Sequence, residues 1–470
     1  MTKQSTADAC IRPGLLRHVS AHASFKNEDF EALPIKCQYI NKKGYKQMKK
    51  FASCFALLTL TVSLFAACNS GDADVTPTPE PTATAAPTAT PEPTATPEPT
   101  KAPTATPLPF DKNVVLMNTY GTVFDRSGVC VTRASDLENV YTVKLIKKHY
   151  NSISLENEMK PDAIMGNVPT LISIDEAKSL GYVIPDNYKD TMVPKLNFTA
   201  TDLAMKLCAE NDLGLRFHTL VWHSQTPNWF FRLDYVGDNG FVSQEVMDAR
   251  LEFYVRTVMK HVYDSEYSSC VYAWDVVNEY WNATDHNWLT IYGKQNYEPS
   301  FVKLAYVIAD DMLKQYGIRD KVSLIFNDFN TYMNSQHLLA IMEFINSDGK
   351  ICDGFGMQAH LDTGYPSTQL FKSTAKKFLD AGYEVQLTEL DVTCTNDTTQ
   401  ANYYYDLMKG LLELKKDGAN ISGITYWGMG DDRSWRGDQT PLLFSMPGIA
   451  KPAYYKVLQA YVDAGYTIQE

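Results

Sequence analysis

Short apolar runs alternate with longer amphipathic segments from about residue 114 onward. The runs predict eight strands, which begin near residues 114, 152, 213, 271, 322, 354, 384 and 421. Apolar residues at three-to-four spacing predict helices between them, at 200–212, 245–263, 300–316, 335–349 and 368–382. Strand and helix alternating eight times favours a (β/α)8 barrel, an α/β fold in which both faces of each strand are buried.

Polar residues follow these runs at or near the points where the strands are expected to end. They are Glu156, Asn157, His223, Asn278, Glu279, Asn327, Asp328, His360, Glu389 and Asp391. Barrel enzymes place their chemistry at the carboxyl ends of the strands, so this pattern predicts an active site there. The alternative fold is an open doubly wound sheet, but neither GxGxxG nor a phosphate loop follows the first run.

Two glutamates stand out among these residues. Glu279 ends the fourth run in WDVVNE, and Glu389 ends the seventh in LTELDV. Glycoside hydrolysis needs two carboxyl groups that flank one glycosidic bond: one protonates the leaving oxygen, and the other attacks the anomeric carbon or activates water. The pair therefore indicates a glycosidase.

At these positions the sequence closely resembles the family 10 glycoside hydrolases, the retaining endo-β-1,4-xylanases. The matching motifs span residues 110–470 in the family's order. They are LENEMK at 155–160, HTLVWHSQTPNW at 218–229, WDVVNE at 274–279, NDFN at 327–330, GMQAHL at 356–361, TELDV at 388–392 and YWGMGDDRSW at 426–435. The resemblance implies a single catalytic domain over 110–470 that needs no cofactor.

The resemblance also implies roles for the residues around the cleavage point. Glu279 would be the acid/base with a raised pKa, and Glu389 the ionised nucleophile, with their carboxyls about 5 to 5.5 Å apart. His360 would hydrogen-bond the nucleophile, and Asp391 would fix the tautomer and charge of that imidazole. Two amides complete the set: Asn278 would bind a sugar 2-hydroxyl, and Gln358 would reach the sugar nearest the cleavage point.

Sugar recognition is expected from a second group of residues. On the glycone side they are Glu156, Asn157, Lys160, His223 and Gln225, and the aromatic faces are those of Trp427 and Trp435. Trp222 and Trp274 are expected to be largely structural. No metal site is expected, because the histidines lack metal-ligand spacing. The segment from 165 to 196 is longer than the family's usual connection and is expected to wall off or extend one end of the cleft.

The first quarter of the chain differs in composition. Residues 76–109 carry 11 of the 23 prolines and 11 threonines, and no aromatic residue, so 69–109 is expected to be a disordered linker. Residues 48–68 read as a lipoprotein-type signal peptide: Lys49 and Lys50 precede an uncharged run that ends in LFAAC, which resembles a lipobox with Cys68 as the lipidated residue. Residues 1–47 are then expected to be an upstream start-site artefact.

The net charge of residues 110–470 limits the kinds of molecule that this part of the chain can bind. Residues 110–470 hold 32 basic and 46 acidic residues, a net charge of −14, which argues against a nucleic-acid surface. We expect xylan or arabinoxylan as the partner, a monomer, and a membrane contact only through a lipid anchor at the cell surface, with plain secretion as the alternative. Two other functions stay open: a β-1,4-glucanase of related barrel type, and a catalytically silent xylan-binding lipoprotein.

Overall fold

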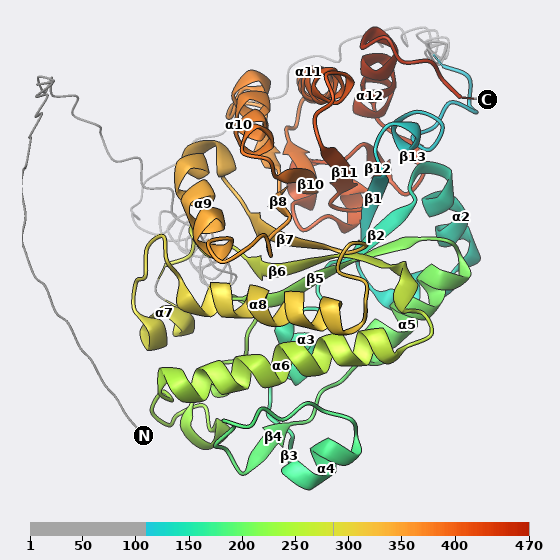
Figure 1. Ribbon diagram of the computed structural model, residues 1–470. Helices are drawn as coiled ribbons and strands as arrows, with labels where there is room; N and C mark the ends of the chain where they lie inside the picture. The colour runs from blue at the N-terminus through green and yellow to red at the C-terminus, as the bar shows by residue number, and fades with distance from the viewer. Residues whose placement is uncertain (1–109, 285, 470) are drawn as a thin grey trace, which may run out of the picture. The chain divides into compact units, whose positions relative to one another are not determined.

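Eight parallel strands form a closed barrel in the computed structural model, which describes residues 110–284 and 286–469 (Figure 1). In barrel order they are β1 Arg126–Val131, β2 Ser152–Leu155, β5 Gly214–Trp222, β6 Val271–Asn278, β7 Ser323–Asp328, β8 Gly354–Met357, β10 Glu384–Thr393 and β11 Ile421–Tyr426. Strand β11 pairs with both β10 and β1, which closes the barrel. The predicted (β/α)8 fold is confirmed.

Helices lie around the outside of the strands. They are α2 Val140–His149, α3 Pro161–Met165, α4 Ile174–Ser179, α5 Thr199–Glu210, α6 Gln244–Asp264, α7 Asn287–Tyr292, α8 Ser300–Gln315, α9 Thr331–Ile345, α10 Thr368–Asp380, α11 Asp397–Lys416 and α12 Pro452–Asp463. The helix predicted at 335–349 is α9, which begins and ends about a turn earlier. Its end is fixed by Asn346, whose side-chain oxygen accepts hydrogen bonds from the amides of Ile351 and Cys352.

The prediction for the first strand was wrong. Residues 114–117 lie in irregular structure, and β1 lies at Arg126–Val131. The true strand carries polar and small residues because part of it faces the crowded barrel interior. A Cβ on Gly128 would come within 2.5 Å of Thr425 Oγ1 and 2.9 Å of Ser152 Oγ, so no larger residue fits.

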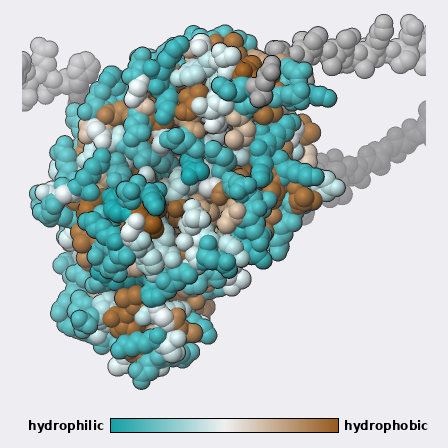
Figure 2. Space-filling view, turned by 45° about the vertical axis from the view of Figure 1, so that its right-hand side comes forward, coloured by the Kyte–Doolittle hydropathy of each residue, from teal (hydrophilic) through white to brown (hydrophobic). Residues whose placement is uncertain are grey.

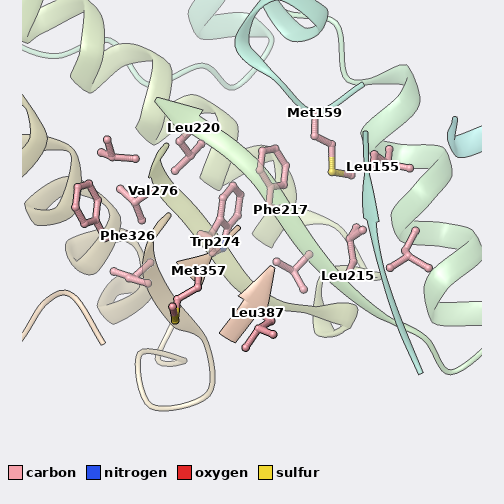
Figure 3. Close-up of a cluster of buried hydrophobic side chains, with 14 of the residues drawn as sticks. Leu155, Met159, Leu215, Phe217, Leu220, Trp274, Val276, Phe326, Met357 and Leu387 are labelled. Carbon is pink, nitrogen blue, oxygen red and sulfur yellow. The ribbon is translucent and has the colours of Figure 1, made fainter. Parts of the chain in front are cut away.

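Successive side chains of these strands point alternately outward, into an apolar layer, and inward, into a polar interior. Side chains on the outer face pack beneath the helices, and Figure 3 shows Leu215, Phe217, Trp274, Val276 and Phe326 in this layer. Phe217 and Trp274 stack with ring centroids 4.1 Å apart. The residues between them point into the barrel, where buried Arg216 donates to Asp275 Oδ2 at 3.0 Å and to Gln386 Oε1 at 2.5 Å. This polar interior lies beneath the carboxyl ends of the strands.

The long segment 165–196 folds into a small unit beside α6. Its antiparallel strands β3 Leu171–Ser173 and β4 Met192–Pro194 flank α4, and Asp190 forms an ion pair with Arg250 of α6 at 2.7 Å. This unit lies at the lower edge of the barrel in Figures 1 and 2 and exposes Val168 and Leu180. Part of the segment thus packs on the outside of the helix layer.

Two smaller pairings complete the fold: β9 His360–Asp362 beside β10, and the antiparallel β12 Phe444–Met446 with β13 Ile449–Ala450. Cys130, Cys208, Cys270 and Cys352 are buried, and Cys394 is partly exposed. Across the described part of the chain, no helix is long and apolar enough to cross a membrane. The predicted start-site artefact, the signal peptide with Cys68, and the linker all lie outside the described residues.

Candidate active site

The two predicted glutamates are joined by a chain of buried amides at the carboxyl ends of the strands. Asn327 of β7 donates to Glu389 Oε1 at 2.8 Å and to Asn278 Oδ1 at 2.8 Å. Gln358, which follows β8, donates to the same Asn278 oxygen at 3.1 Å and to Glu279 Oε1 at 2.8 Å. Residues of β7 and of the turn after β8 thus bridge β6 and β10 and bring Glu279 and Glu389 into one hydrogen-bonded network.

Glu279 sits at a sharp turn immediately after β6. Its φ of 61° lies in the left-handed region, and its amide donates to Asn327 O at 2.8 Å. Gln358 holds one carboxyl oxygen, and Trp222 Nε1 donates to the other at 2.8 Å. Burial raises the pKa of Glu279, the hydrogen bonds from Gln358 and Trp222 lower it, and the charge of Glu389 raises it further. The net shift is upward, which suits a proton donor.

Glu389 lies on β10 in a cationic environment. His360 Nε2 is 3.2 Å from Glu389 Oε2. Burial alone would raise the pKa of Glu389, but His218, His360 and Lys160 outweigh burial and lower it to about 2. Glu389 is therefore ionised wherever Glu279 can still carry a proton, and the two carboxyls differ in charge as an acid and a nucleophile must.

His360 is held by the carboxylate predicted to orient it. Its Nδ1 is 2.9 Å from Asp391 Oδ2. Burial lowers the pKa of His360, but Asp391 and Glu389 outweigh burial and raise it to about 9, so the ring is cationic at neutral pH. Asp391 also accepts hydrogen bonds from Trp435 Nε1 at 2.9 Å and from Arg436 Nη1 at 3.0 Å. Arg436 is not among the residues predicted from the sequence, because the motif YWGMGDDRSW ends at Trp435.

The break between β8 and β9 sets the directions of the Gln358 and His360 side chains. The sequence predicts one strand over 354–361, but Ala359 has a φ of 59° and breaks it. Gln358 before the break contacts Glu279, and His360 after it contacts Glu389. A continuous strand would place both side chains on one face, whereas the break directs each to a different carboxylate.

Three of the five residues predicted for the glycone side, Asn157, Lys160 and Gln225, meet near the ends of β2 and β5. Lys160 Nζ donates to Asn157 Oδ1 and to Gln225 Oε1, both at 3.2 Å. Its ammonium lies 4.5 Å from the centre of the Trp222 ring. Glu156 lines a pocket together with Trp427 and Trp435, on the side of the barrel formed by β1 and β11. Trp435 is half exposed, as a ring that contacts a ligand requires.

His223, also predicted to contact the sugar, lies beside the acid/base candidate. Its Nε2 is 4.0 Å from Glu279 Oε2, and its ring packs beside Trp222 with centroids 5.8 Å apart. Burial lowers the pKa of His223 to about 4, so the ring is neutral next to the acid/base candidate.

The expectation for the two tryptophans holds for one of them. Trp274 is fully buried in the outer core, whereas Trp222 hydrogen-bonds Glu279. A single sequence cannot distinguish these two roles, but the position of Trp222 at the carboxyl end of its strand is a usable signal. Among the residues that the structure describes, no group of three or more His, Cys, Asp and Glu side chains is arranged to hold a metal ion.

The family model described as "Glycosyl hydrolase family 10" matches residues 115–460. The chain belongs to glycosyl hydrolase family 10. A family 10 relative, "Endo-1,4-beta-xylanase A" from Butyrivibrio fibrisolvens, is 46% identical over 349 residues, which cover 74% of this chain and 85% of the relative. "Bifunctional endo-1,4-beta-xylanase XylA" from Ruminococcus flavefaciens is 36% identical over 332 residues, which cover 67% of this chain and 31% of that relative.

Solved structures agree with this family 10 assignment. The N-terminal endo-1,4-beta-D-xylanase 10B modules from Clostridium thermocellum, solved with xylohexaose, match with a TM-score of 0.62 and 28% identity, covering 74% of this chain and 68% of that one. An endo-1,4-beta-xylanase from Caldicellulosiruptor owensensis matches with a TM-score of 0.57 and 27% identity, covering 73% and 99%. The chain is thus a glycoside hydrolase of the xylanase family.

Proposed function

We propose that the chain is an endo-β-1,4-xylanase that cleaves xylan or arabinoxylan with retention of configuration. The observation that carries this proposal is the pair of carboxyls with opposite pKa shifts, raised for Glu279 and lowered to about 2 for Glu389. One protonated and one ionised carboxyl in a shared network is what glycoside hydrolysis by two carboxyls requires, and the resemblance to the retaining family 10 enzymes supports retention. The names of the relatives support xylan as the substrate.

In the first step, a Glu389 oxygen attacks the anomeric carbon while Glu279 gives its proton to the departing glycosidic oxygen. The bond between the sugars breaks, and a glycosyl ester of Glu389 forms. His360 and Asn327, which hydrogen-bond the Glu389 carboxylate, orient it for attack. Gln358 and Trp222 hold the Glu279 carboxyl toward the leaving oxygen.

In the second step, Glu279 acts as a base. It removes a proton from a water molecule, and the water oxygen attacks the anomeric carbon of the ester. The ester bond breaks, Glu389 regains its negative charge, and Glu279 is protonated again. Two inversions at the same carbon leave the configuration of the sugar unchanged.

The substrate is tested by comparing reducing-sugar release from xylan and from carboxymethylcellulose. We expect release from xylan, and loss of that release by a factor of at least about 10⁴ in Glu389→Ala, because the attacking group is gone. Preference for carboxymethylcellulose would support the β-1,4-glucanase alternative. Binding to xylan without any release of sugar would support the catalytically silent alternative.

We further propose that the enzyme is tethered to the cell surface through a lipid on Cys68. The run of uncharged residues after Lys49 and Lys50, followed by LFAAC, supports this. In cells, the wild-type chain should sediment with membranes, and Cys68→Ala should release it from them. Wild-type protein found only in the medium would instead indicate plain secretion.

A further inference from the structure

Asp328 is a buried carboxyl in the active site that the two-step reaction does not use. It is the last residue of β7, and its exposed fraction is 0%. Three groups donate hydrogen bonds to it: the Phe329 amide at 2.8 Å, Asn282 Nδ2 at 2.9 Å and the Trp281 amide at 3.2 Å. Two of these donors belong to the loop that directly follows Glu279.

The loop needs such an anchor because Glu279 has a left-handed backbone. A non-glycine residue keeps a φ of 61° only where surrounding contacts enforce it. On one side of the turn, the Glu279 amide is bonded to Asn327 O. On the other side, Trp281 and Asn282 are bonded to Asp328. Neighbouring residues of β7 thus hold the chain before and after the acid/base.

We infer that Asp328 is a positioning residue for the acid/base: its carboxylate fixes the turn that aims Glu279 at the leaving oxygen. This rests on the proposed function of Glu279. All three contacts are made by donors, so only a group that accepts at both oxygens satisfies them. Burial raises the pKa of Asp328 to about 7, and the charge of Glu279 contributes to the rise.

The test uses Asp328→Asn, which keeps the size of the side chain but turns one acceptor into a donor. Activity is measured on xylotetraose, whose poor leaving group needs a proton, and on dinitrophenyl β-xylobioside, whose leaving group needs none. Because a displacement of about 1 Å can cost a factor of about 100, we expect kcat/KM on xylotetraose to fall by about that factor. The rate of glycosylation with the dinitrophenyl substrate should stay close to the wild-type rate.

A purely structural role would lower both activities equally, and that result, or no loss on xylotetraose, would overturn the inference. Asp353→Asn is the matched control. Asp353 accepts hydrogen bonds from Arg319 and from the Leu324 amide, outside the active site. Any loss of activity in Asp353→Asn should therefore be the same on both substrates.

If Asp328→Asn fails to fold, Asn282→Ala gives a second test. It removes one donor to Asp328 and leaves the carboxylate in place. We expect a smaller loss with the same dependence on the leaving group, and an equal loss on both substrates would overturn the inference. Failure of the proposed function would look different, because the wild-type enzyme would then release nothing from either substrate.

Discussion

At the scale of single residues, the same chemical group has a raised pKa in one place and a lowered pKa in another because its neighbours differ. Glu279 is contacted by uncharged donors, whereas Glu389 has His218, His360 and Lys160 near it, and their pKa values move in opposite directions. The sequence could supply the residue types and the resemblance to a family. It could not supply the contacts of Trp222 and His223 with Glu279, since those depend on how β5 and β6 meet.

His360 offers a direct test of the environment of the proposed nucleophile, Glu389. A cation beside a carboxylate stabilises its ionised form, so His360→Gln should raise the pKa of Glu389 above its value of about 2. The acidic limb of the kcat/KM profile should therefore move to higher pH. Profiles of the two proteins on xylotetraose check this, and an acidic limb that stays in place or moves to lower pH would show that His360 does not set the charge of Glu389.

At the scale of helices and strands, hydrophobic pattern located the elements whose outer faces are apolar. It succeeded for β5, β6 and β7, which carry Phe217, Trp274 and Phe326 on that face. It failed for β1, because Arg126, Ser127 and Gly128 read as a loop although they pair with β11. The barrel interior beside β1 is closely packed, so its residues are small or polar. A search for apolar runs does not detect such a strand.

The outer layer gives a prediction about stability. Trp274 is fully buried, stacks on Phe217 and donates from Nε1 to Tyr263 Oη at 2.6 Å. Trp274→Ala should lower the free energy of unfolding by about 3 to 5 kcal/mol, because a large cavity is left. Urea denaturation measures this change.

Substitution of an exposed aromatic residue is the control for Trp274→Ala. Tyr141 is 78% exposed, and Tyr141→Ala should change the free energy of unfolding by no more than about 0.5 kcal/mol. Equal effects of the two substitutions would contradict the assignment of Trp274 to the core.

At the scale of the whole molecule, the candidate catalytic residues lie at one end of the barrel. Among the residues that the structure describes, the groups bonded around Glu279 and Glu389 lie between residues 126 and 436, and the family match runs from 115 to 460. The net charge of −14 over 110–470 suits an uncharged polysaccharide as substrate, while the proline-rich composition of 76–109 is typical of a linker.

Removing the residues before 110 tests whether the barrel folds and works without them. A chain of residues 110–470 should hydrolyse soluble xylan with the same kcat/KM as a chain of residues 69–470, and the two should have the same melting temperature. Lower activity or a lower melting temperature in the shorter chain would mean that the segment before residue 110 contributes to the fold or to the site.

The most direct test of the central claim is to identify the residue that forms the glycosyl ester. A dinitrophenyl 2-deoxy-2-fluoro-β-xylobioside should inactivate the enzyme, because fluorine slows both steps and the good leaving group restores only the first. Mass spectrometry of the digested protein should then find one label per chain, on Glu389. A label on any other residue, or an active enzyme that gains no label, would contradict the assignment of Glu389 as the nucleophile of a retaining reaction.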